Sequence, residues 1–399
     1  MKTHHQIVII GGGNAGISVA AQLLRKRPTL DIAIVEPSNK HYYQPAWTLV
    51  GGGVFDHQKT VREEAEVMPE NVTWIKAYAD SFKPEENTVQ LRDGNTVTYD
   101  SMVVCPGIQL NWDAVKGLSE TLGKNGVTSN YSFDLAPYTY ECLQKTKPGD
   151  TAIFTSPGTP VKCGGAPQKI MYLAADFWRK KGVLKNVKVE FWTAGGVIFG
   201  IKKYAVELQK MVDYYGINLN FKHDLIAIDG PGKTATFKVT APDGSTSEAT
   251  THFDMIHVTP PQSAPDFIRN SPLVNESGWV DVDKFTLQHR QYANIFGLGD
   301  VTNTPNAKTG AAVRKQAPVV VENLLATLDH QAMHGNYNGY GSCPLVVGYG
   351  KLILAEFDYE NNPTETFPFD QAKPSWMMYQ LKTKILPWLY WNKILKGTA

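Results

Sequence analysis

The hydrophobic positions of the chain form short apolar runs that alternate with amphipathic, helix-like segments. The first run, Ile7–Ile10, is β-branched, and a helical pattern follows it to about Lys26. Further apolar runs predict strands at 31–35, 103–104, 151–154, 187–191 and 294–297. Strands that alternate with helices in this way are typical of α/β domains built on parallel sheets.

Length, charge and hydropathy narrow the class of protein. A chain of 399 residues, 42% of them hydrophobic, exceeds one comfortable core, so we expect two or three packed lobes. The net charge of +1 gives no general attraction for nucleic acid, and no apolar stretch reaches the roughly 18 residues of a membrane-spanning helix. Because the chain enters its first apolar run almost at once, we expect no cleavable signal or transit peptide.

The first strand leads into a glycine-rich turn with the spacing of a dinucleotide-binding motif. Gly11, Gly13 and Gly16 stand in G-x-G-x-x-G order, and the predicted helix begins within this turn. Such glycines permit a tight turn, a close approach of the backbone to a pyrophosphate, and close packing of helix on strand. The next strand ends in Glu36, where an acid accepts a hydrogen bond from a ribose hydroxyl. The turn therefore predicts a dinucleotide site.

Two further segments favour FAD over NAD as the nucleotide. Residues 294–300 read NIFGLGD, and this strand ending in Gly-Asp resembles the second FAD-binding motif of flavoproteins with two dinucleotide-binding domains. Residues 103–107, which end at Gly107, resemble the segment where such chains return to the FAD domain. In that superfamily the aspartate, here Asp300, binds the ribityl chain.

The second glycine motif, where NAD(P)H binds in reductases of this architecture, is missing. The loop between the strands at 151–154 and 187–191 contains TSPGTPVKCGGAPQK, whose glycines do not form the phosphate-binding pattern. Its three prolines also remove backbone donors. We therefore expect pyridine nucleotide to bind poorly, if at all.

The same loop carries one of four cysteines in the chain, Cys163. No two cysteines have C-x-x-C spacing and none has a histidine at ligand spacing, so we expect no metal site. Cys163 stands beside Lys162 and ahead of a helix start, an environment that lowers the pKa of a thiol and makes it nucleophilic. Cys105 and Cys142 are predicted to be structural, and Cys343 is the candidate redox partner.

At this point the chain resembles the sulfide:quinone oxidoreductases, in particular the type found in animal mitochondria. The resemblance rests on VKCGGAPQK at 161–169, SCPLVVGYGKLILAEFDY at 342–359, HYYQPAWTLVGGG at 41–53 and ETFPFDQ at 365–371. It implies FAD, a location on a membrane surface, quinone as electron acceptor, and Cys163 with Cys343 as the redox-active pair. Hydrosulfide would attack a sulfur held by Cys343 and release Cys163 as a thiolate, and a thiol or sulfite would then remove the outer sulfur.

The resemblance also assigns cofactor and quinone contacts residue by residue. Asn14 and Ala15 would lie at the FAD pyrophosphate, Glu36 at the adenosine ribose, and Ala79 at the adenine. Gln44 would lie near the flavin, and Lys308 with Thr309 at the pyrimidine edge of its ring, where a lysine would stabilise the anionic reduced form. Phe357 and Tyr379 are candidates for the quinone channel.

The C-terminal segment has the composition of an interfacial helix. Residues 371–399 hold five lysines and no acid, with Trp376, Trp388 and Trp391 among aliphatic residues. Pro387 is expected to divide the segment into two short helices. It would attach the protein peripherally to a membrane; alternatively, it docks on the flavin domain or forms a dimer interface, in which case the chain would be a homo-oligomer.

Together these features predict an α/β fold with two Rossmann-like domains of the FAD-dependent disulfide-reductase type and a C-terminal amphipathic helical region. The expected FAD domain comprises 1–112 and 265–340, the second domain 113–264, and the membrane-associated region 341–399. Two alternatives remain: a type II NADH:quinone oxidoreductase, which the missing glycine motif disfavours, and a non-enzymatic thiol redox sensor that binds FAD. A flavocytochrome-type sulfide dehydrogenase would need a signal peptide, which we do not expect.

Overall fold

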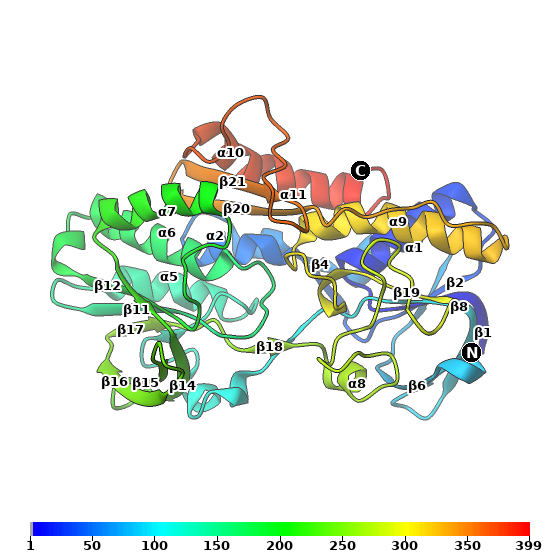
Figure 1. Cartoon of the computed structure of the whole chain (residues 1–399), viewed down its shortest axis with the longest axis horizontal. Helices are drawn as coiled ribbons and strands as arrows, with labels where there is room; N and C mark the ends of the chain where they lie inside the picture. Colours follow the sequence, from blue (N-terminus) through cyan, green and yellow to red (C-terminus); the bar gives the residue numbers. More distant parts are fainter. Residues whose placement is uncertain (1–2) are drawn as a thin grey trace.

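The computed structural model describes residues 3–399 and shows two lobes with a C-terminal layer lying across them (Figure 1). In the first lobe, a seven-stranded sheet has the order β5-β2-β1-β8-β7-β6, and β19 also pairs with β8. Its strands are β1 (His4–Ile10), β2 (Ile32–Val35), β5 (Val72–Ile75), β6 (Ala79–Lys83), β7 (Thr88–Leu91), β8 (Thr96–Val104) and β19 (Ile295–Gly297).

The central strands of this sheet are apolar because both of their faces are covered. Residues 7–10 of β1 are buried between β2 and β8, with which β1 pairs in parallel. Helices α1 (Asn14–Lys26) and α9 (Gly310–Leu328) pack against each other over the sheet. Since β19 is also parallel to β8, the loops after β1, β8 and β19 begin at one edge of the sheet, where ligands bind in open α/β folds.

The second lobe repeats the parallel plan, which confirms the predicted α/β fold with two Rossmann-like units. Its sheet has the order β10-β17-β11-β12-β13, and a three-stranded antiparallel sheet, β14-β15-β16, lies beside it. The strands are β10 (Val127–Thr128), β11 (Thr151–Ser156), β12 (Lys188–Thr193), β13 (Asn218–Phe221), β14 (His223–Asp229), β15 (Thr234–Thr240), β16 (Thr246–His252) and β17 (Met255–His257). Its main helices are α5 (Ala136–Lys145), α6 (Ala166–Lys180) and α7 (Lys202–Tyr215).

The chain passes between the lobes twice, and the two passages are paired. The short strands β9 (Gln109–Leu110) and β18 (Gln262–Ser263) are antiparallel neighbours at this point. The side chain of Asn111 also donates to the Ser263 hydroxyl at 3.1 Å. The two lobes are therefore joined by a braced double connection rather than by single loose linkers.

The C-terminal layer consists of a hairpin and a helical run. Strands β20 (Gly341–Gly348) and β21 (Lys351–Phe357) form the hairpin, which packs on α6. The helical run comprises α10 (Trp376–Gln380), a π-helical turn at Leu381–Ile385, α11 (Leu386–Leu389) and a second π-helical turn at Tyr390–Ile394. Over the range 3–399, no helix combines the length and apolar character required to cross a bilayer.

One expectation for this layer is wrong: Pro387 does not divide it into two separate helices. The helical run is continuous from 376 to 394. Pro387 lies in the first turn of α11, and the turn before it is π-helical. The altered hydrogen-bonding pattern of that turn accommodates a residue without an N–H, so the chain continues without a break.

Candidate active site

The turn between β1 and α1 has the shape that its glycines predict. Gly11 has φ +105°, and a Cβ there would lie 2.7 Å from the carbonyl oxygen of Cys105. A Cβ at Gly16 would lie 1.9 Å from the carbonyl oxygen of Gly11, so only glycine permits this packing of helix on strand. At Gly13, by contrast, a Cβ would meet nothing within 4 Å. The N-terminus of α1 thus borders open space, with Asn14 and Ala15 forming its first turn.

Glu36 lies directly beside this turn. Its carboxylate accepts hydrogen bonds from the backbone N–H groups of Gly12 and Ser38, both at 2.8 Å. Burial raises the pKa of Glu36, and the two backbone donors act in the opposite direction. Ala79 is buried at the start of β6, and Gly107 follows β8 with φ +79° and open space around it. These residues therefore surround the predicted dinucleotide site.

Asp300 and Lys308 lie in the loop after β19, at the same edge of the sheet. The Lys308 Nζ donates to the carbonyl oxygens of Asp300 and Thr302, at 2.8 and 2.9 Å, and lies 3.9 Å from the centre of the Trp279 ring. Thr309 caps α9 by accepting a hydrogen bond from the Ala312 N–H. Lys308 therefore fixes the loop that carries Asp300.

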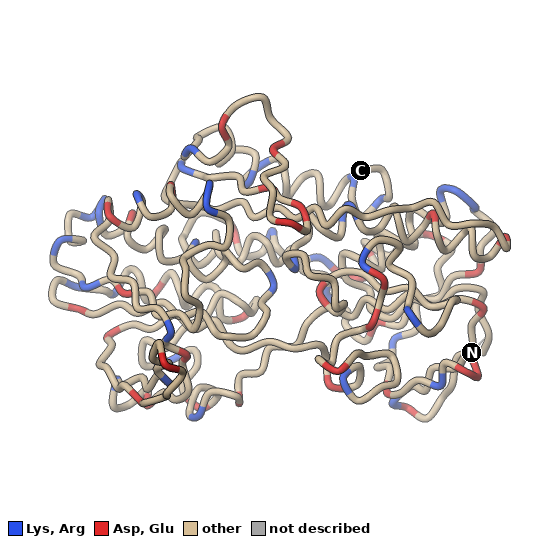
Figure 2. Tube along the Cα trace, in the orientation of Figure 1, with Lys and Arg blue, Asp and Glu red and all other residues tan. Residues whose placement is uncertain are grey.

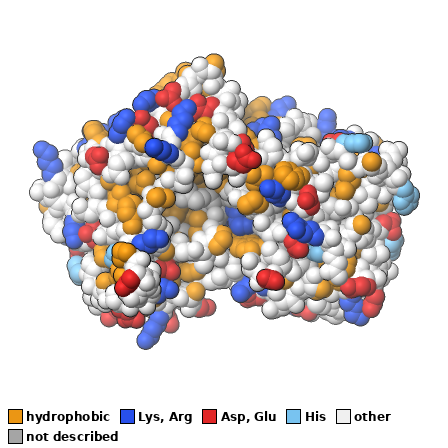
Figure 3. All heavy atoms as spheres, in the orientation of Figure 1, with side chains coloured by type: hydrophobic (Ala, Val, Ile, Leu, Met, Phe, Trp, Pro, Cys, Tyr) orange, Lys and Arg blue, Asp and Glu red, His pale blue; other side chains and the backbone are white. Residues whose placement is uncertain are grey.

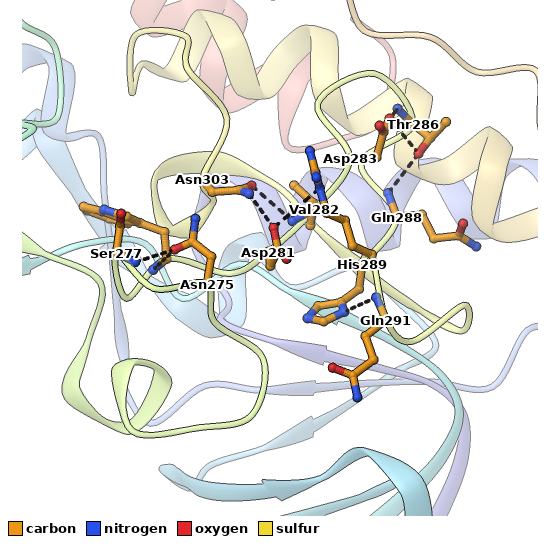
Figure 4. Close-up of polar contacts among 12 residues, drawn as sticks. Asn275, Ser277, Asp281, Val282, Asp283, Thr286, Gln288, His289, Gln291 and Asn303 are labelled. Atoms are coloured by element: carbon orange, nitrogen blue, oxygen red, sulfur yellow. Dashed lines mark hydrogen bonds and ion pairs between the residues drawn. The ribbon is translucent and has the colours of Figure 1, made fainter.

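The loop after β19 is also held by a network of polar contacts with the segment that precedes β19 (Figure 4). The amide of Asn303 donates to the Asp281 carboxylate at 2.7 Å and accepts from the Val282 N–H at 3.1 Å. Close by, the imidazole of His289 accepts from the Gln291 N–H. His289 also contacts the carbonyl of Leu273. These contacts stabilise the segment that precedes and follows β19.

The structure brings the two candidate redox cysteines together, although they are 180 residues apart in the chain. The Sγ atoms of Cys163 and Cys343 are 3.0 Å apart, and both residues are free cysteines. Cys163 precedes α6 and has φ +92°, a conformation unusual for a residue with a side chain. Cys343 is buried on β20. Gly165 allows the contact, since a Cβ there would lie 2.6 Å from the Cys343 Sγ.

The cation that acts on Cys163 is not the one predicted. Lys169, one turn into α6, places its Nζ 3.1 Å from the Cys163 Sγ. The side chain of Lys162 instead points to Gln44 and donates to its amide oxygen at 2.8 Å. Lys162 forms a β-bridge with Lys308, and the next residue, Cys163, has φ +92°, so the chain turns between them and adjacency in sequence misplaced the cation.

The two thiols differ strongly in acidity. The pKa of Cys163 lies well below its usual value because Cys343 donates a hydrogen bond to it and because Lys169 is close. The pKa of Cys343 is raised by the neighbouring Cys163 sulfur and by burial. Cys163 is therefore the more acidic thiol of the pair, and Cys343 is the one that holds its proton more tightly. Lys169 stays charged: burial alone would lower its pKa, but the thiolate outweighs burial and raises it.

A second lysine reaches this site from the far end of the chain. Lys382, in the C-terminal helical run, is only 5% exposed, and its Nζ donates to the carbonyl oxygen of Pro45 at 2.9 Å. Burial, together with the charge of Lys169, lowers the pKa of Lys382 to about 7. The sequence placed Lys382 among the interfacial lysines, and the structure corrects this. The inward direction has no local signal, because it depends on how the helical run docks.

The other cysteines and the candidate quinone residues are buried at separate places. Cys105 lies at the end of β8 with its Sγ near the Gly11 carbonyl, and Cys142 lies within α5; burial raises the pKa of both. Phe357 packs in the same apolar cluster as Cys343. Tyr379 packs in a different cluster, with residues such as Leu352. The structure does not bring Phe357 and Tyr379 into one cluster, and their role in quinone binding stays a prediction.

The C-terminal helical run has an apolar exposed side. Its large hydrophobic residues Trp376, Met377, Ile385 and Trp388 are all more than half exposed. Lys384, Lys393 and Lys396 are exposed on the same run, and Figure 2 shows cationic residues along it without acidic ones. Trp391, in contrast, is buried and packs near His41, whose imidazole contacts the Tyr390 hydroxyl at 2.6 Å.

On the face that Figure 3 shows, the surface is hollowed between the two lobes. The glycine turn, Glu36 and Asp300 come from the first lobe, and the cysteine loop comes from the second. Among the residues from 3 to 399, no group of three or more His, Cys, Asp and Glu side chains could hold a metal ion.

Comparison with known proteins gives one consistent family. Residues 5–137 match the family model of pyridine nucleotide-disulphide oxidoreductases. The chain is 48% identical to the mitochondrial sulfide:quinone oxidoreductase of Dictyostelium discoideum, over 100% of this chain and 87% of the relative. It is 43% identical to the mouse (Mus musculus) protein of the same name, over 99% and 87%. The X-ray structure of the enzyme from Aquifex aeolicus has the same fold, with a TM-score of 0.81 at 22% identity, over 99% of this chain and 92% of that one.

Proposed function

Since the chain belongs to the sulfide:quinone oxidoreductase family, it is an oxidoreductase that acts on sulfide with quinone as acceptor, and we propose that Cys163, Cys343 and FAD carry the reaction. The observation that supports this most directly is the 3.0 Å contact between the two sulfurs, with Lys169 beside one of them. The alternative of a non-enzymatic sensor is disfavoured by the relatives, which are named as enzymes and match nearly the whole chain.

The residues present fit FAD. The open space at Gly13 and Gly107 leaves room for a pyrophosphate and a ring system at the edge where Glu36 and Asp300 lie. The glycine turn with Asn14 and Ala15 would hold the pyrophosphate, Glu36 the ribose, Ala79 the adenine and Asp300 the ribityl chain. Gln44, Lys308 and Thr309 would border the flavin. When bound, FAD would accept two electrons from the sulfur pair and release them to quinone.

The first step follows from the difference in acidity between the two sulfurs. In the oxidised protein the sulfurs of Cys163 and Cys343 are joined, directly or through bridging sulfur. In the direct disulfide, hydrosulfide attacks the Cys343 sulfur, a new S–S bond forms there, and the bond to Cys163 breaks with its electron pair. Cys163 is the better leaving group because its pKa is lower, and Lys169 stabilises the thiolate that forms.

The second step removes the sulfane sulfur and restores the pair. The thiolate of a small acceptor, or sulfite, attacks the outer sulfur of the Cys343 persulfide and releases Cys343 as a thiolate. When the two cysteine thiolates join again they give up two electrons, for which bound FAD would be the acceptor. One hydrosulfide and one acceptor thiolate thus become one persulfide and two electrons.

We also propose that the exposed apolar side of the C-terminal helical run rests on a membrane and that quinone, of the ubiquinone kind, enters from there. Trp376 and Trp388 have the amphipathic rings that favour the lipid interface, and the exposed lysines favour anionic headgroups. In a flotation assay with anionic vesicles, changing both tryptophans to serine should reduce the bound fraction several-fold. The control is Tyr214→Ser, which removes an exposed aromatic ring elsewhere on the protein and should leave binding unchanged. Trp192 is unsuitable as a control because it is buried.

The decisive experiment is anaerobic mixing of the FAD-loaded protein with sulfide while the flavin absorbance is followed. The natural chain should be bleached by sulfide and reoxidised by a short-chain quinone. Cys163→Ser and Cys343→Ser should each slow bleaching by ~10³-fold or more, because each removes a sulfur that forms a covalent bond in the reaction. Both variants should keep their flavin. If they bleach as fast as the natural chain, the cysteine mechanism is wrong.

A further inference from the structure

Lys162 is a half-buried cation that the sulfur chemistry does not use. Its Nζ turns away from Cys163 and donates to the Gln44 amide oxygen. The ammonium lies 5.5 Å from the centre of the Trp47 ring and 5.8 Å from that of Tyr131. Within the described chain, no carboxylate forms an ion pair with it. A lysine in such surroundings keeps two N–H groups free for a further partner.

The backbone fixes Lys162 beside the FAD lobe, although it belongs to the second lobe. Its segment forms a parallel β-bridge with Lys308, and its N–H donates to the Gln262 side chain at 2.9 Å. Burial raises the pKa of the Asp300 carboxyl, and the positive charges of Lys308 and Lys162 both act to lower it. Burial lowers the pKa of each lysine to about 8. Two cations therefore face one carboxylate, while the Cys163 sulfur has a cation of its own in Lys169.

The two lysines are not equivalent. Lys308 directs its ammonium to the Asp300 and Thr302 carbonyls and to the Trp279 ring, so its donors serve the loop. The Lys162 ammonium has a single hydrogen-bond partner, Gln44, which is itself proposed to border the flavin. Of the two, Lys162 is the one whose charge is available to a bound group that gains negative charge on reduction.

We propose that Lys162 is a second, previously unassigned positioning residue for the flavin, which together with Gln44 stabilises its anionic reduced form and raises its reduction potential. This inference rests on the proposed binding of FAD. It separates two lysines that lie close together in the chain: Lys169 acts on the sulfur, and Lys162 acts on the cofactor.

The test measures the midpoint potential of the bound flavin by anaerobic reduction in the presence of a reference dye, with no sulfide or quinone present. Lys162→Met should make reduction less favourable by about tenfold, which for a two-electron couple is a shift of about 30 mV to more negative potential. Lys162→Arg, which keeps the charge, and Lys185→Met, which changes an exposed lysine on the second lobe, should both retain the natural potential.

A second neutral variant guards against loss of the fold. Lys162→Gln keeps a donor for Gln44 but removes the charge, and it should show the same shift as Lys162→Met. A natural potential in both neutral variants, or an equal shift in Lys162→Arg, would overturn the proposal. An altered rate of Cys163 alkylation with an unaltered potential would return Lys162 to the sulfur. Failure of the natural chain to bind FAD would instead refute the proposed function, and flavin absorbance detects it first.

Discussion

The two lobes each contain a strand, a loop and a helix in the same order, and they use the loop for different chemistry. In the first lobe, the loop between β1 and α1 closes on itself: the missing Cβ of Gly16 makes room for the Gly11 carbonyl. In the second lobe, the loop between β11 and α6 makes room for another part of the chain. The missing Cβ of Gly165 accommodates Leu345 and Cys343 of β20.

The difference shows that two βαβ units of the same fold can use the loop before the helix in different ways. In the first lobe the N-terminus of the helix remains open, as the free space at Gly13 shows. In the second lobe the hairpin packs against α6 and occupies the approach to its first turn. The glycines of the two loops serve the same steric purpose, but only the first loop leaves its helix N-terminus to a ligand.

Among the changes that compare the two loops, the largest effect is expected from adding one methyl group to the first loop. Gly16→Ala should weaken FAD retention by about tenfold or more, because the added Cβ overlaps a backbone carbonyl that cannot move aside. Gly164→Ala, in the second loop, should retain FAD, since a Cβ there meets nothing within 4 Å. Flavin absorbance after gel filtration measures both. If both variants lost FAD to the same extent, the proposed difference between the two loops would be wrong.

A smaller effect should follow from removing the cation of the second loop. Lys169→Met should raise the pKa of Cys163, because it removes the positive charge that stabilises the thiolate. The thiolate of the natural chain persists as the pH falls below the usual range for cysteine, so alkylation of Cys163 persists too. In the variant, alkylation should fall off at a higher pH.

This measurement is best made in a Cys343→Ser chain, in which Cys163 is the one half-exposed cysteine of the described structure. Removal of Cys343 also removes the hydrogen bond to Cys163, so the comparison is made between chains that both carry that change. Lys162→Met is the matched control, and it should leave the alkylation profile unchanged. A shift with Lys162→Met as large as with Lys169→Met would contradict the assignment of the two lysines.

The smallest expected effect is that of NADH. Under anaerobic conditions NADH should not bleach the flavin on the timescale of sulfide, because the second loop offers no phosphate-binding turn and the hairpin lies against α6. The same sample, mixed with sulfide afterwards, serves as the positive control. Rapid bleaching by NADH would show that the second lobe still binds a nucleotide.

What the sequence could predict depends on how far apart the interacting residues lie. The turn with Gly11, Gly13 and Gly16 is local, and its geometry follows from the spacing alone. The fold could also be predicted, because the alternation of strands and helices is a pattern of neighbouring residues. The choice between Lys162 and Lys169 could not be made by proximity in sequence. Helical spacing does point to Lys169 as the cation near the cysteine loop, because Lys169 lies one turn after Gly165, where α6 begins.

Contacts between distant segments cannot be predicted from local patterns of hydrophobic and polar residues. Lys382 belongs to a segment whose composition indicates a surface, and its inward direction follows only from the docking of the helical run on Pro45. The helix continues through Pro387 because of a π-helical turn, and the conformational preferences of the residues do not predict that turn. The proximity of Cys343 to Cys163 came from a family resemblance, because neither spacing nor hydropathy links two residues that far apart.

The position of Cys343 in the chain has a consequence for biosynthesis. The first lobe is closed by β19 and α9, both of which precede β20, so the lobe with the glycine turn is complete before the hairpin has been synthesised. Chains are made from the N-terminus, and domains generally fold as units during synthesis. A nascent or truncated chain therefore presents Cys163 without its partner. Only chains that extend beyond Cys343 on β20 can bring the two sulfurs together, so the pair forms after the first lobe is complete.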